Sequence, residues 1–175
     1  IEFKTVASGI TAADLMVKTA AVELLEAQVV CPGKYIALIA GDLSAVNAAV
    51  VSARRYGAEN LIGDFVLGNP DASIFPAIYG TSEIGKVSAL GILETYDAAS
   101  IIVAADIAAK TAIVSLIELR IAKGMCGKSY LLLTGEVAAC TAAIEKAREA
   151  IKENGMYLDS SVIANPDPKL WQTIV

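Results

Sequence analysis

Three cysteines carry the side chains of this sequence that are best suited to metal or redox chemistry. Cys31 stands directly before Pro32 and Gly33, Cys126 follows a methionine and precedes a glycine, and Cys140 lies in the segment GEVAACTAAIEKAREA. The sequence contains no histidine. It therefore excludes Ser-His and Cys-His nucleophilic pairs and every zinc site that uses histidine. An odd number of cysteines without regular spacing does not predict a disulfide framework or a ferredoxin-type ligand set within one chain.

The surroundings of the cysteines separate them into two kinds. Cys140 has apolar neighbours at helical spacing, which predicts a small hydrophobic core residue. Cys31 and Cys126 lie in glycine-containing turns, where a thiol stays accessible. Cys31 is either a small turn residue or a ligand, and the residues alone leave both readings open. Cys126 is either a plain turn residue or the competing ligand.

Composition and charge limit the classes of function. The chain of 175 residues is 55% hydrophobic, yet charged residues interrupt its longest apolar run, which excludes a membrane span. A chain this apolar is expected to bury surface between subunits, so we expect an oligomer. The net charge of −5 and the lack of clustered Lys and Arg argue against nucleic-acid binding. Without a signal peptide at IEFKTV, we expect a cytoplasmic protein.

Internal repetition is the strongest pattern in the sequence. Residues 1–26 and 93–118 are identical at 13 of 26 positions. Two further pairs of segments match in the same order: PGKYIALIAGD with CGKSYLLLTGE, and VLGNPD with VIANPD. The chain is therefore a tandem duplication. We predict a first domain over residues 1–84, with a truncated opening strand, and a second over residues 85–175.

Each copy predicts the element order β-α-β-β-α-β, a split βαβ arrangement of the ferredoxin-like α+β class. Apolar spacing predicts a first helix, with Asp14 and Lys18 paired on another face. Pro32 and Gly33 are expected in the central positions of a hairpin turn. The elements expected in the first copy are a strand before residue 10, a helix over 11–25, strands over 27–31 and 35–40, a helix over 43–57 and a strand over 63–67.

These blocks resemble the shell proteins of bacterial microcompartments, specifically the tandem-domain type that forms trimers. The resemblance rests on ILET, AADLMVKTA and AADIAAKTA, the turn blocks containing CPGKYIALIAGD and CGKSYLLLTGE, and the pair VLGNPD and VIANPD. It covers both halves of the chain in unpermuted order. Within the family, the Cys-Pro-Gly-Lys turn is most similar to the trimeric type of propanediol-utilisation compartments, which binds an iron–sulfur cluster.

The resemblance implies a homotrimer in which six similar domains form a pseudohexamer, an α/β sandwich tile. It places the hairpin turns around a central opening. The pore-lining residues would then be Cys31, Pro32, Gly33, Met125, Cys126 and Gly127. It further implies one oxygen-sensitive [4Fe–4S] cluster per trimer on the threefold axis, held by Cys31 from each chain, with Cys126 as the alternative ligand.

The same resemblance implies roles at the edges of the tile. Lys18 and Lys110 would meet their counterparts at the boundary between tiles, beside Asp14 and Asp106; solvated helix pairs are the simpler alternative. Many members of the family carry a Pro-Arg-Pro-type edge segment. This chain has Asn-Pro-Asp there instead, at residues 69–71 and 165–167. The partners would be other shell proteins side by side in the microcompartment shell, and enclosed redox enzymes.

Three functions compete as explanations of these observations. The preferred one is a structural tile whose cluster carries electrons or is transferred across the shell. A plain small-molecule pore tile without a cluster is the alternative. A trimeric ligand sensor would need a long gating loop and clustered basic residues, which the sequence lacks. An enzyme is not expected, because neither a phosphate loop nor a dinucleotide fingerprint is present.

Overall fold

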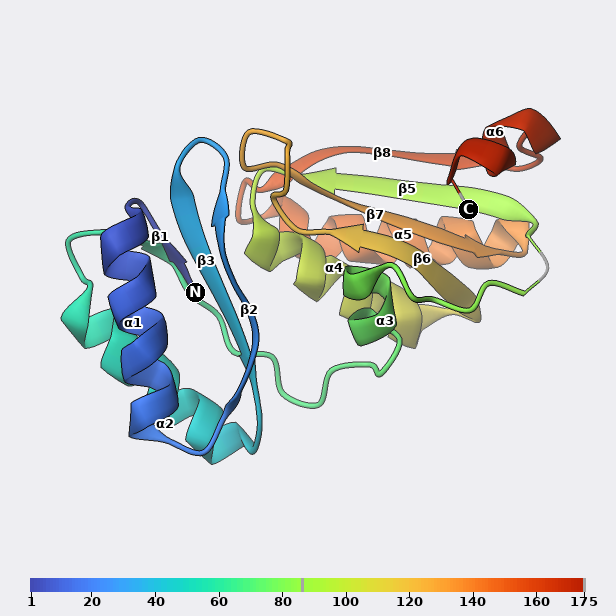
Figure 1. Ribbon diagram of the computed structural model, residues 1–175. Helices are drawn as coiled ribbons and strands as arrows, with labels where there is room; N and C mark the ends of the chain where they lie inside the picture. The colour runs from blue at the N-terminus through green and yellow to red at the C-terminus, as the bar shows by residue number, and fades with distance from the viewer. Residues whose placement is uncertain (86, 175) are drawn as a thin grey trace. The chain divides into compact units, whose positions relative to one another are not determined.

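The chain folds into two compact units, Ile1–Gly68 and Asn69–Val175. The structure is a computed structural model that describes residues 1–85 and 87–174 (Figure 1). The predicted boundary between residues 84 and 85 stays a prediction, and the residues that join the two repeats, from Asn69 onward, are grouped with the second unit. Among the described residues, no helix is long and apolar enough to cross a membrane.

The first unit is a four-stranded antiparallel sheet with two helices that pack on each other and on the sheet. Its strand order is β2-β3-β1-β4, which is the order of a split βαβ fold. The elements are β1 (Glu2–Phe3), α1 (Val6–Thr19), β2 (Glu23–Val30), β3 (Lys34–Ala40), α2 (Leu43–Tyr56) and β4 (Leu61–Gly63).

The second unit repeats this topology, with strand order β6-β7-β5-β8 and helices α4 and α5 packed together. Two short helices, α3 and α6, each follow one copy of the repeat (Figure 1). The predicted α+β fold with two tandem domains is therefore confirmed. The elements are α3 (Ile74–Tyr79), β5 (Ala89–Thr95), α4 (Ala98–Thr111), β6 (Val114–Arg120), β7 (Ser129–Gly135), α5 (Val137–Lys152), β8 (Tyr157–Ile163) and α6 (Pro168–Ile174).

The first helix begins and ends earlier than its apolar spacing predicted. The side chain of Thr5 accepts a hydrogen bond from the N–H of Ser8, which satisfies one free donor at the start of α1. Asp97 caps α4 through Ser100 in the same way. Ala20 is extended, with φ −151° and ψ 160°, so the helix ends there and β2 begins at Glu23. The prediction of a helix over 11–25 was therefore wrong at both ends.

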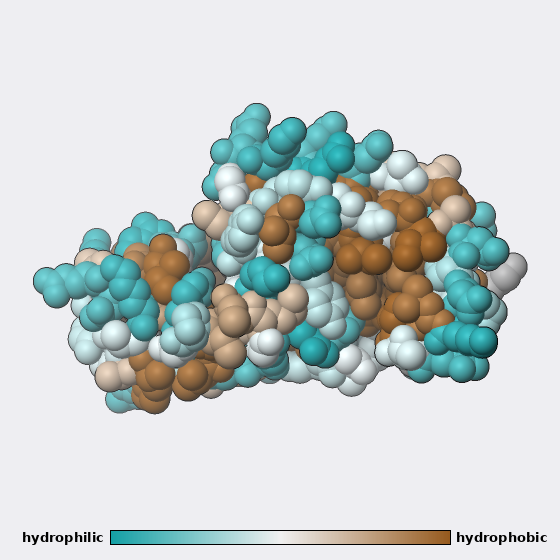
Figure 2. Space-filling model, turned by 90° about the horizontal axis from the view of Figure 1, so that it is seen from above, coloured by the Kyte–Doolittle hydropathy of each residue, from teal (hydrophilic) through white to brown (hydrophobic). Residues whose placement is uncertain are grey.

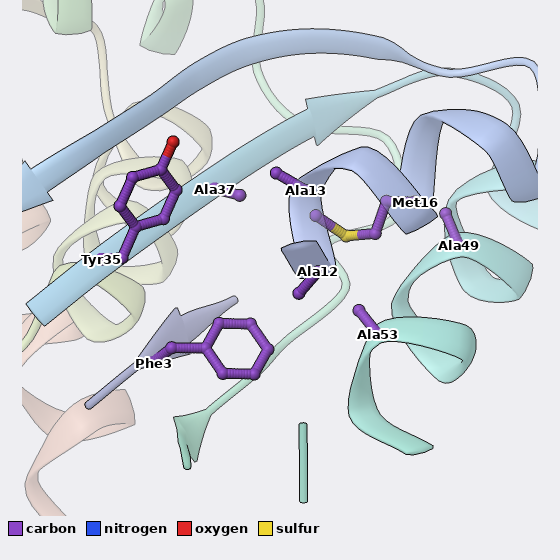
Figure 3. Packing of buried hydrophobic residues seen from close by; sticks show 8 residues of the cluster. All are labelled: Phe3, Ala12, Ala13, Met16, Tyr35, Ala37, Ala49 and Ala53. Carbon is purple, nitrogen blue, oxygen red and sulfur yellow. The ribbon is translucent and has the colours of Figure 1, made fainter. Parts of the chain in front are cut away.

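The core of the first unit lies between β1, β3 and the two helices (Figure 3). Phe3 and Tyr35 supply its aromatic rings, and Met16 of α1 fills the space beside small residues of α2. A Cβ built on Gly9 would lie 2.4 Å from Cβ of Tyr35, so α1 approaches the sheet more closely than any other residue would allow. The labelled cluster is Phe3, Ala12, Ala13, Met16, Tyr35, Ala37, Ala49 and Ala53.

The last strand of the first unit is shorter than predicted. The strand predicted over 63–67 is Leu61–Gly63, because the chain leaves the sheet before the Asn-Pro-Asp segment.

On the surface, hydrophobic side chains form patches bordered by hydrophilic ones on the face shown in Figure 2. Apolar patches of this kind on a folded chain are typical of surfaces that bind other proteins.

Candidate functional site: the hairpin turns and the paired helices

In the first hairpin turn, Cys31 is one of the two central residues rather than the residue before them. The N–H of Gly33 donates a hydrogen bond of 2.9 Å to the carbonyl oxygen of Val30. This bond makes Cys31 and Pro32 the two central residues of the turn, so the prediction of Pro32 and Gly33 as the central pair was wrong. The peptide bond before Pro32 is cis. Cys31 is a free thiol and half-buried, while Pro32 and Gly33 are exposed at the tip.

The second hairpin presents Cys126 differently. The N–H of Lys128 donates a hydrogen bond of 3.1 Å to the carbonyl of Met125, which makes Cys126 and Gly127 the central residues. Both have positive φ, 54° and 87°. Cys126 therefore sits in a conformation that favours glycine. Its thiol is free and exposed, and the loop between β6 and β7 spans residues 121–128, against 31–33 in the first hairpin.

Cys140 lies in the core of the second unit, as its spacing predicted. It is fully buried on α5, and its Sγ lies 3.8 Å from the carbonyl oxygen of Ala89 on β5. Burial raises the pKa of the Cys140 thiol, and the nearby carboxylate of Glu136 raises it further. A buried thiol with a raised pKa is inert, since the thiolate is the reactive form. Cys140 is therefore a packing residue.

The described part of one chain contains no group of three or more Cys, Asp or Glu side chains that could hold a metal ion. Cys31 belongs to the first unit and Cys126 to the second. A single chain therefore offers one thiol at each turn, and any cluster site has to combine copies. The predicted pore-lining roles of Cys31, Pro32, Gly33, Met125, Cys126 and Gly127 stay predictions.

The two predicted helix ion pairs are present. Nζ of Lys18 lies 2.6 Å from Oδ2 of Asp14, and Nζ of Lys110 lies 2.7 Å from Oδ1 of Asp106. The first pair is exposed, whereas the carboxylate of Asp106 is buried. An exposed pair of this kind contributes less than about 1 kcal/mol. The roles of the four residues at tile edges stay predictions.

The partners of the buried pair were not predicted from the sequence. The backbone N–H of Asp71 donates a hydrogen bond of 2.8 Å to Oδ1 of Asp106, and Lys110 donates one of 2.7 Å to the carbonyl oxygen of Asn69. Asp71 also accepts hydrogen bonds from the hydroxyl and the backbone N–H of Ser73, which lower its pKa. The repeated Asn-Pro-Asp block was the available signal, because it recurs at residues 69–71 and 165–167.

A second polar network lies on β6 and β7. The hydroxyl of Tyr130 donates a hydrogen bond of 2.6 Å to Glu118, which also accepts two from the guanidinium of Arg120. Burial, and then the hydrogen bond to Glu118, raise the pKa of Tyr130 to about 12. The repeat gave no signal for this network, because the first copy has Gln28 where the second has Arg120. It likewise has Ile36 where the second has Tyr130.

Comparison with known proteins agrees with this architecture along the whole chain. The family model for the BMC domain matches twice, over residues 1–70 and 89–166. The chain is 36% identical to the bacterial microcompartment shell protein PduT of Citrobacter freundii, over 100% of this chain and 95% of that protein. The crystal structure of a microcompartments protein from Desulfitobacterium hafniense DCB superposes with a TM-score of 0.92 at 44% identity, covering 98% of this chain and 95% of the other.

Proposed function

Since the chain belongs to the family of bacterial microcompartment shell proteins with two BMC domains, we propose that three copies form a tile whose centre holds one [4Fe–4S] cluster. The role in the shell is structural rather than enzymatic, and shell proteins of this family assemble with one another. The cluster, the trimer and any exchange with enclosed redox enzymes are the proposed part. The observation that carries the proposal is the free, half-buried thiol of Cys31 in the central part of the first hairpin turn.

The duplication supports the proposed trimer. The two units share one topology, with strand orders β2-β3-β1-β4 and β6-β7-β5-β8. If the first unit of one copy meets the second unit of the next, the contact is heterologous, and it closes into a ring when the rotation allows. Three chains then supply six similar units. A closed ring also gives each hairpin turn two symmetry-related copies around one axis.

The donor set fits a cluster only in such a ring. Thiolates are the usual ligands of iron–sulfur clusters, and the ring supplies three of them from Cys31, one per chain. The tip is open within its own chain, because a Cβ built on Gly33 would meet no atom within 4 Å. Cys31 in the first central position of each turn would hold the group, with one iron left for another ligand. When bound, a [4Fe–4S] cluster supplies one-electron transfer, or is itself the group that is passed on.

Cys126 and an empty pore are the competing readings. Cys126 also occupies the first central position of its turn, and it is the more exposed thiol. The eight-residue loop 121–128 places it in a longer connection between strands than that of Cys31. Cys31 lies in a loop of only three residues between paired strands, so its thiol direction is better defined. We therefore assign the ligand to Cys31.

The experiment is anaerobic purification of the full chain with measurement of visible absorbance, iron and acid-labile sulfide. We expect a brown protein with about four irons for every three chains, following from one cluster in each trimer. Cys31→Ser should lose colour and iron and keep its oligomeric state, and Cys126→Ser should keep both. The reverse pattern would assign the site to the second hairpin. An iron-free parent after anaerobic reconstitution would leave a plain pore tile.

A further inference from the structure

The segment that follows the first repeat is docked on the second unit through polar and apolar contacts. Asp71 and Asn69 bind Asp106 and Lys110 of α4 through the two hydrogen bonds described above. Immediately afterward, α3 packs against β6 and α4 (Figure 1). Ile74 and Ala77 of α3 are buried there, at 2% and 0% exposure. This stretch, residues 69–79, is called the docking segment below.

The second repeat ends in a segment with the same sequence pattern and the same local fold. Asn165, Pro166 and Asp167 match Asn69, Pro70 and Asp71 at an offset of 96 residues. Asp167 accepts a hydrogen bond of 2.8 Å from the N–H of Lys169, as Asp71 accepts one of 2.9 Å from Ser73. Leu170 and Trp171 then stand where α3 has Ile74 and Phe75. Residues 165–174, called the tail below, therefore repeat the sequence pattern and the turn of the docking segment.

The helix of the tail buries none of its side chains within the chain, although Pro166 before it is buried and Trp171 is half-buried. All seven residues of α6, Pro168–Ile174, are described, and none of them is buried. Leu170 is exposed, although the matching Ile74 is fully buried. An exposed leucine on a two-turn helix contributes little hydrophobic stabilisation in this position. The tail is therefore an apolar surface that lacks its contact.

The first unit has a surface that matches the one on which the docking segment lies, and the side chains of this surface are exposed. Each residue of this surface has a match on the second unit at an offset of 92 residues. Ile10 is 53% exposed where Ile102 is 6% exposed, and Leu24 is 40% exposed where Leu116 is 2% exposed. The side chain of Asp14 is 54% exposed where that of Asp106 is 8% exposed. This surface, formed by Ile10, Asp14, Lys18 and Leu24, is called the α1 face below.

We propose that the tail of one chain docks on the α1 face of a second copy of the same chain, repeating between chains the contact that the docking segment makes within one. The N–H of Asp167 then donates to Asp14, Lys18 donates to the carbonyl of Asn165, and Leu170 covers Ile10 and Leu24. The occupant is a second copy because the tail carries the sequence and the turn that the matching face of the second unit already binds.

This contact joins the end of one chain to the beginning of the next, so it is heterologous and can close a ring. The inference rests on the trimer of the proposed function, and it states which residues hold that trimer together. It does not depend on the cluster. In the assembled ring, the docking segments and the tails would alternate, and each α4 and α1 helix would carry one of them.

The test uses light scattering of the full chain with single substitutions on each half of the contact. Leu170→Asp places a charge on the tail, and Ile10→Asp places one on the α1 face. Both residues are exposed in the single chain, so circular dichroism should show an unchanged fold. We expect the molar mass to fall from three chains to one for each variant. Val137→Asp, at an equally exposed apolar residue outside both surfaces, should stay a trimer.

A mixture of the two monomeric variants adds a result that general damage cannot produce. Leu170→Asp keeps an intact α1 face and Ile10→Asp keeps an intact tail, so one good contact forms between them. We expect a one-to-one dimer at high concentration, and monomers when each variant is alone. Trimeric variants, or a mixture that does not pair, would overturn the proposal while leaving the trimer itself standing. A monomeric parent would instead contradict the trimer of the proposed function.

Discussion

The backbone N–H of Asp71 lies 2.8 Å from Oδ1 of Asp106, although the two residues belong to different copies of the repeat. The carboxylate of Asp106 is buried and also binds Lys110, which in turn holds the carbonyl of Asn69. A buried carboxylate is stable only when such donors satisfy it. The helix pair that the sequence predicted is therefore part of a lock that fixes the docking segment to the second unit.

Removing the acceptor of this lock should destabilise the second unit. Asp106→Ala leaves the N–H of Asp71 without its acceptor and Lys110 without its carboxylate, at a cost of about 1–3 kcal/mol. The matched control is Glu149→Ala, which breaks the exposed pair with Lys146 and should cost less than about 0.5 kcal/mol. Urea denaturation followed by circular dichroism measures both. Equal effects of the two variants would show that the lock contributes nothing.

The repeat predicted the topology because it keeps the residues that topology depends on. Ala12, Ala13 and Asp14 recur as Ala104, Ala105 and Asp106, so both copies place the same helix face on the same sheet. The ends of elements were predicted less well. Val22 continues the apolar spacing of α1, yet the backbone is already extended at Ala20.

The missing parts of the site depend on contacts that a local pattern does not report. Asp71 and Asp106 are 35 residues apart, and nothing near either residue identifies the other. The same limit applies to Tyr130 and Glu118, which are paired only because β6 and β7 form a hairpin. The proposed cluster ligands are harder still to predict from a pattern. The three thiols come from three chains, so no spacing within one sequence relates them. The expectation of a cluster rests on the family resemblance, whereas the geometry of the turns comes from the fold.

Tyr130 should ionise about two pH units later than an ordinary tyrosine. Burial and its hydrogen bond to Glu118 raise its pKa from 10.0 to about 12. Because the folded pKa is raised, the neutral hydroxyl contributes stability that is present below pH 10 and is lost as the pH rises through 12. The difference in absorbance at alkaline pH between the parent and Tyr130→Phe isolates this group.

The midpoint of that difference curve should lie at about pH 12. Glu118→Gln removes the negative charge and keeps an acceptor, so the midpoint should fall while staying above 10.0, because burial remains. A midpoint of 10 in the parent would mean that Tyr130 is neither desolvated nor bound to Glu118 in solution.

Lys18 and Lys110 have two proposed roles: a hydrogen bond to a backbone carbonyl within the trimer, and a charged contact between tiles. A suitable substitution separates the two. Lys110 already donates to the carbonyl of Asn69, and Lys18 would do the same for a docked tail. Glutamine retains an N–H donor and removes the charge. The double variant Lys18→Gln and Lys110→Gln should therefore stay trimeric by light scattering, while its sheets in electron micrographs become smaller or disappear. Sheets equal to those of the parent would leave both lysines as solvated helix positions with local contacts only.

The three thiols should react with Ellman's reagent in an order set by their surroundings. In protein freed of iron by a chelator, we expect exposed Cys126 to react first and half-buried Cys31 more slowly. Cys140 should react only after unfolding, because burial raises its pKa and hides its sulfur. Anaerobic reconstitution with iron and sulfide should then remove Cys31 from the reactive set and leave Cys126 reactive. The variant Cys126→Ser makes this protection measurable on a single thiol. If Cys31 reacts at the same rate before and after reconstitution, it holds no cluster, and the turn lines an ordinary pore.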